Sequence, residues 1–462
     1  MKTKLVPSGW IEREGRRLDC GPYLSGAIEA KLLLEKLAVP KDLLQSLTLG
    51  GRTGVFHAGR ESRTWVEDPS YGVPFLSSSD VLMADLSRVS LISRKQVVAN
   101  PKFILHKGWT LITRSGTIGR MAYCRPDMEG YACSEHILRV APDESKILPG
   151  YLFAFLASRY GLPMVVGGTY GSIIQAIEPE HILNLPVPRL GEEGERAIHD
   201  LIERAAVLRA QAPALWARAR TSIEAEVGWK PMPLGFNVSA VRATALQRRF
   251  DAFHFSLPVH SGRNSLAEHG SACPIVEKIE CVIEPNRGAR LKVEDPEFGI
   301  PFLSSSEVFS LTPRADYLIS KRTSDLDTFI LSDRDLLLPR SGQVGGLIGR
   351  AILPVSQIVG MAGSEHLIRV RCRSKEDAAY LWAVLASGPG YLAVVGTAFG
   401  SSIPSLDRNL VGALKVPWLR GKRRDTISDS VMQAQTGLEE AIKLEEKAIN
   451  LVSRIVGELG SN

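Results

Sequence analysis

Two polar turns, one in each half of the chain, carry side chains that could hold a charged or hydrogen-bonding ligand. Residues 114–120 read Arg-Ser-Gly-Thr-Ile-Gly-Arg, and residues 340–350 read Arg-Ser-Gly-Gln-Val-Gly-Gly-Leu-Ile-Gly-Arg. Glycine permits a tight turn with an accessible backbone, so a phosphate or a base edge could approach the arginines closely. The alternative is that each turn merely joins two strands.

Two further motif pairs could contribute hydroxyl groups and aromatic rings. Pro-Phe-Leu-Ser-Ser-Ser at residues 74–79 returns at residues 301–306, and a glycine-rich loop at residues 168–172 returns at residues 396–401. The serines could bond phosphates, but serine followed by an acidic residue also caps helices well, and we favour a cap for at least one of them. Tyr170 and Phe399, in the two loops, could stack on a base or pack a strand end.

Three short motifs imitate catalytic sites. Ser-Glu-His at residues 134–136 and 364–366 would lie on a strand, where neighbouring side chains point in opposite directions, so we interpret it as a structural or ligand-contact element. Asp-Pro-Ser-Tyr at residues 68–71 resembles the catalytic motif of amino-methyltransferases, and Pro126-Asp127 with Glu144 and Lys146 resembles a nuclease site.

The second half of the chain repeats neither the methyltransferase-like motif nor the nuclease-like motif. The second half keeps the Asp-Pro turn without the methyltransferase likeness, and it has no matching carboxylate trio. No glycine-rich cofactor loop precedes residue 68, and no nucleotide phosphate-binding motif is present. We therefore expect no catalytic residue, no cofactor and no metal site.

The repeated motifs keep an offset of 226 to 230 residues along the chain. That period is far longer than a solenoid repeat, so almost the whole chain is one domain-sized unit that occurs twice. The loops diverge, since residues 50–65 and 284–292 have little in common and the turns after Arg114 and Arg340 differ in length. A shared framework with divergent loops predicts two sites that bind different ligand sequences.

Bulk composition restricts the class of protein. The chain has 462 residues, a net charge of +6, 44% hydrophobic residues and a mean hydropathy near zero, which allows a core in each half. The six cysteines form no C-x-x-C pair, so a disulfide framework or zinc site is not expected. The N-terminus lacks an apolar leader and no apolar run reaches about 20 residues, so we expect a cytoplasmic protein without membrane contact.

A long helical pattern follows each repeat, at residues 192–227 and 425–459. The first pattern has apolar residues at alternating spacings of four and three, with a kink expected at Pro213: Leu201, Ala205, Leu208, Ala212, Leu215 and Ala219. The second has a similar row, which Glu445 interrupts: Ile427, Val431, Ala434, Leu438, Ala441, Ala448, Val452, Ile455 and Leu459. Such rows are typical of coiled coils, and an antiparallel pair would let the two rows bury each other.

The order of globule, rod, globule and rod resembles the specificity subunit of type I restriction–modification systems over nearly the whole chain. Members of that family have two target-recognition domains, each followed by a long helix. They open with Arg-x-Asp-Ala-x-aromatic-aromatic, which residues 249–255 resemble, whereas the first copy departs with Cys20 and Pro22. They also carry an Arg-Ser-Gly-x-x-Gly turn, which residues 114–119 resemble.

The resemblance implies an α+β fold in which two tandem-repeated mixed α/β target-recognition domains are separated by two long helices that pair as an antiparallel coiled coil. The implied boundaries are residues 1–189, 190–229, 230–420 and 421–462. The implied function is recognition of a bipartite site on double-stranded DNA. Its partners would be DNA methyltransferase (modification) subunits and a restriction (helicase-nuclease) subunit, which would perform the chemistry.

On this interpretation the DNA-contacting residues come from three motif pairs: the arginine turns, the serine motifs and the glycine-rich loops. They are Ser77, Ser78, Arg114, Ser115, Thr117, Arg120, Thr169, Tyr170, Ser304, Ser305, Arg340, Ser341, Gln343, Arg350, Thr397 and Phe399. Two alternatives stay open: a self-sufficient methyltransferase or nuclease, and a duplicated scaffold protein that binds no DNA. A methyl-transfer assay on the isolated chain and a salt-dependent gel shift would distinguish them.

Overall fold

The structure, a computed structural model, divides into two compact units, Met1–Ala210 with Glu440–Asn462 and Gln211–Glu439. It describes all residues except 1–2, 14–15, 17, 19, 168–175, 233–237, 239, 248, 289, 401 and 461–462. The side chains of Ala245 and Gln247 are also not described. Thr169 and Tyr170 therefore lie outside the described residues.

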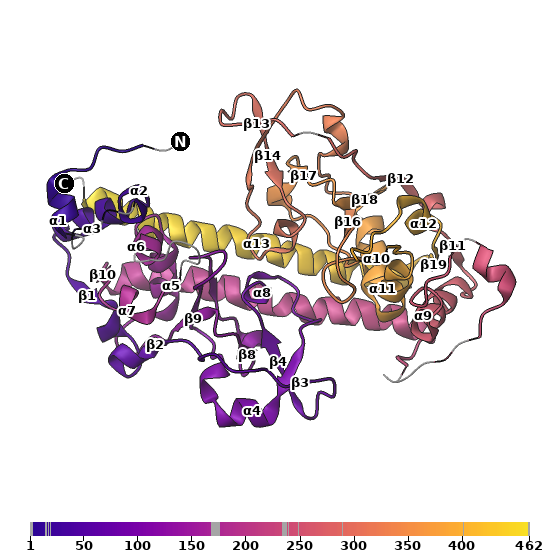
Figure 1. The fold of residues 1–462 in the computed structure, drawn as a ribbon, viewed down its shortest axis with the longest axis horizontal. Coiled ribbons are helices and arrows are strands. Elements are labelled where there is room, and N and C mark those ends of the chain that lie inside the picture. Colours follow the sequence, from indigo (N-terminus) through magenta and orange to yellow (C-terminus); the bar gives the residue numbers. More distant parts are fainter. Residues whose placement is uncertain are drawn as a thin grey trace. The chain divides into compact units, whose positions relative to one another are not determined.

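Short strands and helices alternate in both units (Figure 1). The first unit contains α1 (Ser8–Arg13), α2 (Gly21–Leu24), α3 (Ala27–Lys36), β1 (Lys41–Leu43), β2 (Val55–Phe56), β3 (Trp65–Val66), β4 (Gly72–Leu76), β5 (Leu91–Ser93), α4 (Arg94–Ala99), β6 (Thr110–Thr113), β7 (Met121–Tyr123), β8 (Ala132–Cys133), β9 (Ile137–Val140), α5 (Pro149–Ala157), α6 (Gly161–Gly167), α7 (Pro179–Ile182) and β10 (Pro186–Pro188). The second contains α9 (Leu257–Ala267), β11 (Ala272–Pro274), β12 (Ile279–Ile283), β13 (Lys292–Val293), β14 (Gly299–Leu303), β15 (Tyr317–Ser320), β16 (Asp335–Pro339), β17 (Ala362–Gly363), β18 (Leu367–Cys372), α10 (Lys375–Ala386), α11 (Gly388–Val395), α12 (Arg408–Gly412) and β19 (Lys415–Pro417). Two long helices, α8 (Glu192–Glu226) and α13 (Lys422–Leu459), each contribute one part to each unit.

The two units share one sheet topology, except that the counterpart of β7 in the second unit is only an isolated bridge, Leu337 opposite Ile352. Three small sheets of the first unit, ordered β1-β10, β2-β9-β6-β7 and β3-β5-β4-β8, correspond to β11-β19, β12-β18-β16 and β13-β15-β14-β17 in the second. In the third sheet of each unit the central strand pairs in parallel with the last strand, Phe75 opposite Ala132 and Phe302 opposite Ala362. The repeat seen in the sequence is therefore a repeat of the fold, as expected.

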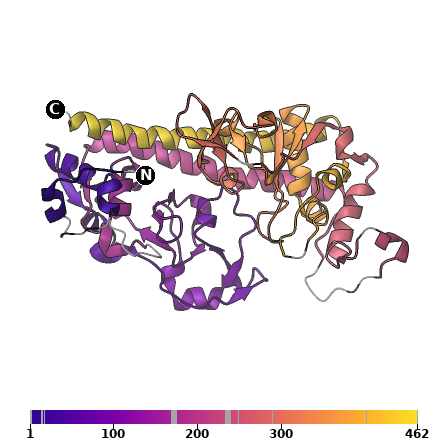
Figure 2. The same ribbon diagram turned by 45° about the horizontal axis from the view of Figure 1, so that its top comes forward.

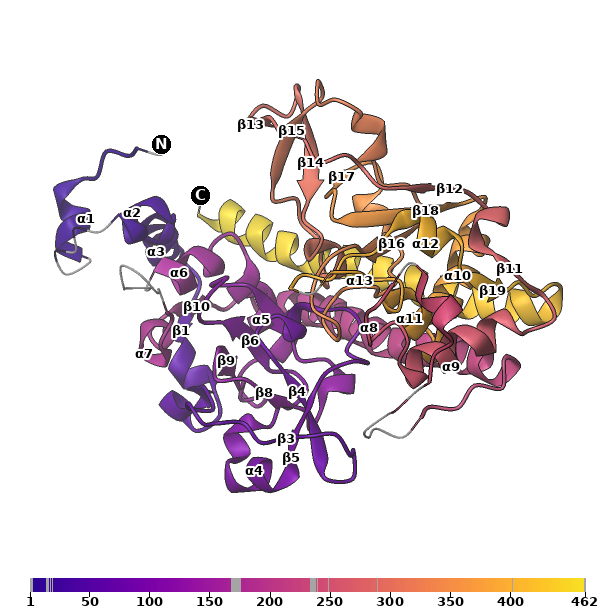
Figure 3. The same ribbon diagram turned by 45° about the vertical axis from the view of Figure 1, so that its right-hand side comes forward.

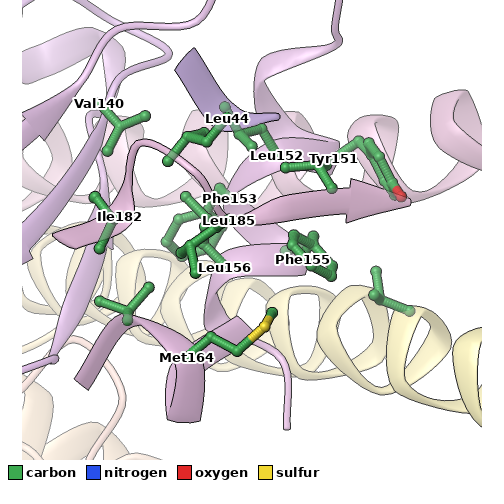
Figure 4. Close-up of a cluster of buried hydrophobic side chains, with 14 of the residues drawn as sticks. Leu44, Val140, Tyr151, Leu152, Phe153, Phe155, Leu156, Met164, Ile182 and Leu185 are labelled. Atoms are coloured by element: carbon green, nitrogen blue, oxygen red, sulfur yellow. The ribbon is translucent and has the colours of Figure 1, made fainter. Parts of the chain in front are cut away.

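Each core is built around a helix that is apolar on all sides. Apart from its C-terminal Ala157, every residue of α5 is buried, and so are residues 378–385 of α10. Figure 4 shows the aromatic side chains of α5 gathered with Leu44, Val140 and Met164. A tyrosine at the same repeat position in each helix donates its hydroxyl to a proline carbonyl of the edge strand, Tyr151 to Pro188 and Tyr380 to Pro417.

Helices α10 and α11 are also the most membrane-like stretch by composition. Among the described residues no single helix is both long and apolar enough to cross a bilayer. Taken together, α10 and α11 meet that length and composition, and they are bent by 83° at their junction.

Within each unit the segments of α8 and α13 lie side by side in opposite directions (Figure 2). In the first unit Arg209 of α8 pairs with Glu445 of α13 at 3.1 Å, and in the second Glu226 near the end of α8 pairs with Arg423 near the start of α13 at 3.2 Å. The antiparallel pairing and the α+β class are as expected. Glu445, which interrupts the apolar row of α13, thus meets a buried arginine, an arrangement that can fix the register of two helices.

The buried row of α8 differs from the expected one. Leu201, Leu208 and Leu215 are half-buried, whereas the residues one position later, Ile202, Arg209 and Trp216, are buried. The alanines of the expected row are buried as expected. Because α8 packs against its own domain as well as against α13, it must bury two adjacent rows, and periodicity alone could not assign the larger side chains. The helix continues through Pro213.

Candidate nucleic-acid interface

Three turns gather at the end of the parallel strand pair in each unit. The carboxyl ends of β4 and β8 meet at one edge of the sheet, so the serine turn (residues 77–80) and the Ser-Glu-His turn (residues 134–136) are neighbours. The Ser134 backbone N–H donates to the Leu76 carbonyl at 2.9 Å. In the second unit the serine turn (304–307) and the Ser-Glu-His turn (364–366) meet through the same bond, Ser364 to Leu303 at 3.0 Å.

The arginine turns, residues 114–120 and 340–350, join the same edge. The N–H groups of Arg114 and Arg340 donate to the carbonyls of the histidines, His136 at 3.0 Å and His366 at 2.8 Å. The carbonyls of the same arginines accept from the N–H groups of Ile177 at 3.0 Å and Leu406 at 2.7 Å, which follow the glycine-rich loops in the sequence. The Ser-Glu-His turn is therefore the hub at which predicted motifs from distant parts of the sequence come together.

A buried arginine holds the hub in each unit, and the sequence reading missed it. Arg139 of β9 and Arg369 of β18 are fully buried and direct their guanidinium groups at backbone carbonyls. Arg139 donates to Phe103, Cys133, Ser134 and Ile137, and Arg369 to Phe329, Gly363, Ser364 and Leu367. Burial lowers the pKa of Arg369 to about 10, so it still carries its charge at neutral pH.

A second arginine pair that the sequence reading missed covers the acidic residue of the hub. Arg63 lies over the ring of Phe75 at 4.9 Å and pairs with Glu135 at 2.6 Å. Burial opposes ionisation of Glu135, yet the bond from Arg63 keeps the pKa of that carboxyl below its ordinary value.

The second unit repeats this arrangement. Arg290 lies 4.8 Å from the Phe302 ring and 3.4 Å from Glu365. Arg63 and Arg290 stand 227 residues apart, inside the segments judged to have little in common, and that shared offset was the available signal.

The two predicted arginines at the start of the arginine turns face inward. Arg114 is 8% exposed, donates through Nε to the Ile177 carbonyl at 3.0 Å, and forms an ion pair with Glu178. Arg340 is more exposed and pairs with Glu284 at 2.7 Å. These contacts favour a role in holding the turns, and DNA contact by Arg114 or Arg340 stays a prediction.

Ser77 and Asp80 bond each other at the start of the serine turn, whereas Ser79 and Ser306, the N-cap residues of the 3-10 helices that follow, make no side-chain cap bond. Ser77 Oγ accepts from the Asp80 N–H at 3.2 Å, and Asp80 accepts in return from the N–H and hydroxyl of Ser77 at 2.9 and 2.6 Å. Ser304 instead donates its N–H to Asp316 at 2.8 Å. Ser78 and Ser305 are partly exposed, and within the described residues their hydroxyls have no hydrogen-bond partner.

The remaining predicted residues divide by exposure. Thr117 and Gln343 are exposed at the tips of the arginine turns, and Gln343 Nε2 donates to the Ser402 carbonyl at 3.0 Å. Phe399 is 51% exposed, whereas Thr397 is buried with its hydroxyl bonded to Val394 at 2.7 Å.

The other four predicted residues of the arginine turns are partly exposed: Arg120, Arg350, Ser115 and Ser341. Both serines are engaged across the edge. Ser115 bonds His136 Nδ1 at 2.7 Å, and Ser341 bonds Ser405 at 2.8 Å. Arg350 donates to the Gly345 carbonyl within its own turn at 3.4 Å.

The segment at residues 249–255 forms hydrogen bonds with the glycine-rich loop of the second unit. Arg249 donates to the carbonyls of Gly396, Thr397 and Ala398, just after the end of α11, where a cation is favoured. His254 bonds the Gly396 carbonyl through Nδ1 at 2.7 Å. Burial first, and then the neighbouring Arg249 and Arg263, lower the pKa of His254 although that bond opposes the shift.

The acidic residues that imitate catalytic motifs are occupied by local partners. Both oxygens of Asp127 bond the guanidinium of Arg125 at 2.9 Å. Asp68 accepts from the N–H and hydroxyl of Ser70 at 2.8 and 2.7 Å. In the described part of the chain, no cluster of three His, Cys, Asp or Glu residues is placed to hold a metal ion.

Comparisons with known proteins find similar structures but no similar sequence. No family model matches the chain, and no curated protein matches it. Similar solved structures include the S subunit of a type I restriction-modification system from M. genitalium, with 12% identity, 92% of this chain and 96% of that chain covered, and a TM-score of 0.33.

Two further structures are similar over comparable lengths. They are the HsdS subunit from Thermoanaerobacter tengcongensis (12% identity, 91% and 96% covered, TM-score 0.28) and a chain from a structure of complex assembly and conformational transition in a type I R-M system (14%, 92% and 98%, 0.29). The M. genitalium chain and the last of these chains come from type I systems, the class that the sequence resembles. At these TM-scores the likeness is no basis for assigning a function, which has to rest on the residues of this chain.

Proposed function

We propose that the chain is the DNA-recognition subunit of a type I restriction–modification system and reads a bipartite duplex site, one half with each unit. Residues 1–189 and 230–420 are the proposed target-recognition domains, and residues 190–229 and 421–462 the helical spacers. The supporting observation is that both units bring the same turns to one sheet edge but expose different side chains there.

Retained and divergent residues at that edge fit the two kinds of DNA contact. The phosphate backbone is the same at every site, so residues that contact it can be the same in both units, whereas base edges differ. The proposed phosphate ligands are side chains that reach solvent and are retained in both units. Ser78, Ser305, His136 and His366 belong to the edge, and the exposed Arg60 and Arg287 each lie three residues before the arginine that pairs with the glutamate of the hub. The histidines are each more than 40% exposed at the side chain.

The divergent tips of the arginine turns are the proposed base readers. Thr117 stands in a seven-residue turn, and Gln343 stands in an eleven-residue turn that presents more backbone and an amide side chain. A glutamine can bond adenine through two atoms, whereas a threonine offers one hydroxyl and a methyl group. The two half-sites should therefore differ in sequence.

Methylation and cleavage would belong to partner subunits. The acidic residues that imitate catalytic motifs are held by Arg125 and Ser70, which supports a non-catalytic role. The purified chain is expected to transfer no methyl group from S-adenosylmethionine to DNA. Methylation by the chain alone, lost in Tyr71→Ala, would contradict this.

The direct test is the salt dependence of duplex binding by the purified full-length chain. Affinity should fall log-linearly with salt, and Arg60→Ala and Arg287→Ala should each lower the slope by about 1 without changing the preferred sequence. Arg52→Ala is the matched control, because Arg52 is an exposed arginine with Ile279 at its repeat position. Absence of binding, or binding that ignores salt, would contradict the proposal.

A further inference from the structure

A further pair of solvent-exposed side chains stands beside the hub, at repeat positions that carry different residue types. Trp65 of β3 is 51% exposed, and 227 residues later Lys292 of β13 is also exposed. Each lies two residues after the arginine that pairs with the glutamate of the hub, Arg63 or Arg290. In Figure 3 strands β3, β4 and β5 lie together in the first unit, and β13, β14 and β15 in the second.

In the first unit the indole of Trp65 packs against the strand that leads into the serine turn. Its ring lies edge-on to the ring of Phe75, with 5.3 Å between centroids and 90° between planes. The guanidinium of Arg63 lies 4.9 Å from the centroid of the same ring and reaches the hub glutamate, Glu135, at 2.6 Å. The exposed indole is therefore continuous with the proposed DNA interface.

In the second unit another strand supplies the covering ring. Tyr317 of β15 stacks on Phe302, with 5.0 Å between centroids and 19° between planes. Arg290 donates to the Tyr317 hydroxyl at 2.9 Å, and Lys292 extends over the tyrosine ring with Nζ 4.0 Å from its centroid. Among the described residues the ammonium group of Lys292 has no acidic partner, so it stays available to an acceptor.

The framework at this position is the same in both units, but the group that it exposes differs. The buried phenylalanine is covered by Trp65 in one unit and by Tyr317 in the other, so the fold keeps a ring there without fixing which strand provides it. The same segments retain Arg60 and Arg287, the proposed phosphate ligands. A phosphate contact can be identical in both units, whereas an exposed group that changes from indole to ammonium fits contacts to different bases.

We propose that Trp65 and Lys292 are further base-reading residues, one for each half-site. This inference rests on the function proposed above and adds a second reading position to each unit. The apolar face of an indole fits the C5-methyl group of thymine, whereas a lysine ammonium donates to O6 and N7 of guanine. At the base pair that each side chain contacts, the first half-site should therefore contain an A·T pair and the second a G·C pair.

Selection of bound duplexes from a random pool, with the full-length chain, locates these two base pairs. Trp65→Lys should replace a thymine preference by a guanine preference at one position of one half-site. Lys292→Ala should lose a guanine preference of about tenfold at one position of the other half-site. Trp65→Phe and Lys292→Arg should keep the parental motif, because each retains the kind of group that meets the base.

Modified bases test the two contacts without altering the protein. Scanning the thymines of the first half-site with deoxyuridine removes one methyl group at a time, and at the contacted position the parent should bind about fourfold more weakly. Trp65→Lys should be indifferent to that substitution, and Trp65→Phe should remain sensitive to it. Scanning the guanines of the second half-site with 7-deazaguanine should weaken the parent at one position and leave Lys292→Ala indifferent there. A residue that only packs against its strand would not make binding depend on one methyl group or one ring nitrogen.

Matched control variants exclude general surface effects. Tyr71 is an exposed aromatic residue, 68%, that directly precedes β4, and Lys415 is an exposed lysine of β19, in a different sheet from β13. Tyr71→Ala and Lys415→Ala should leave both the selected motif and its affinity unchanged. Thermal unfolding of Trp65→Lys measures separately the packing that is lost on Phe75.

The outcomes distinguish this inference from the proposed function. If the parent selects a bipartite motif that Trp65→Lys and Lys292→Ala leave unchanged, these two residues read no base and the DNA-recognition function stands. If Lys292→Ala weakens all sequences alike and lowers the salt slope by about 1, Lys292 contacts a phosphate and the inference is wrong for the second unit. If the parent selects no sequence, the proposed function fails and this inference fails with it.

Discussion

The two units retain one arginine and neutralise it in different ways. In the first unit Arg114 pairs with Glu178, the residue that also caps α7, and His57 Nε2 lies 3.7 Å from the same carboxylate. In the second unit Arg340 pairs with Glu284, which occupies the repeat position of His57. Asp407 occupies the repeat position of Glu178. It caps α12 by accepting from the Asn409 and Leu410 N–H groups.

This difference shows which part of the site belongs to the framework. The cation is kept while its acidic partner has moved, as expected for a side chain whose task is to hold a turn. Residue type and position in a glycine-rich turn had marked both arginines as ligand contacts. Thr117 and Gln343, at the tips of the same turns, reach solvent and differ between the units.

The largest expected effect comes from removing the buried arginine beneath each hub. Arg139→Met or Arg369→Met would leave several buried carbonyls without a donor, and each should cost about 3–5 kcal/mol of unfolding free energy. Hydrogen exchange followed by mass spectrometry would assign the loss to one unit. Equal losses would support a shared framework, and a loss under about 1 kcal/mol in either unit would break the comparison.

Removing the inward arginines should cost less and unequally. Arg114→Ala should lose about 2–3 kcal/mol, because it leaves Glu178 partly buried without its partner. Arg340→Ala should lose about 1–2 kcal/mol, since its guanidinium is more exposed. The measurement is denaturant unfolding of both variants. If Arg114→Ala keeps its stability and changes the preferred bases, Arg114 is a reader and not a framework residue.

Sequence reasoning succeeded where the signal was local or repeated. The first long helix was expected at residues 192–227 and spans Glu192–Glu226. The direction of Arg114 was not predictable, because Glu178 lies 64 residues away and is brought near only by the fold. The role of Arg139 was not predictable either, because the carbonyls it bonds flank the Ser-Glu-His turn or, like Phe103, lie 36 residues away.

Moving the acid within the first unit would sharpen the comparison. Glu178→Gln should cost about 1–2 kcal/mol, because the amide can still cap α7 but cannot neutralise Arg114. Adding His57→Glu would recreate the arrangement of the second unit and should recover at least half of that loss in thermal unfolding. A double variant no more stable than Glu178→Gln would mean that the two arrangements are not interchangeable.

The smallest expected effect is a decrease of folding stability at low pH, to which both units contribute. Burial is the largest cause that lowers the pKa of His57 and of His254 below the ordinary 6.5; Arg114 then acts on His57, and Arg249 and Arg263 on His254. As pH falls below about 6.5 the unfolded chain takes up these protons before the folded chain does, so stability should fall with pH. Glu178 and Asp251 face the two imidazoles and oppose the shift.

A variant isolates the contribution of one imidazole. His254→Gln keeps a donor for the Gly396 carbonyl but cannot be protonated, so its melting temperature should fall less than that of the parent between pH 7.5 and pH 5.5. The expected difference corresponds to less than about 1 kcal/mol of unfolding free energy. An identical pH dependence in parent and variant would show that His254 does not titrate in this range.

Selection of bound DNA from a random duplex pool tests the two-reader account most directly. The parent should select a bipartite motif with two different halves, Thr117→Ala should relax bases in one half only, and Gln343→Ala should relax bases in the other only, each by about 1–3 kcal/mol per base. Selection of one contiguous motif, or relaxation of both halves by either variant, would contradict the account.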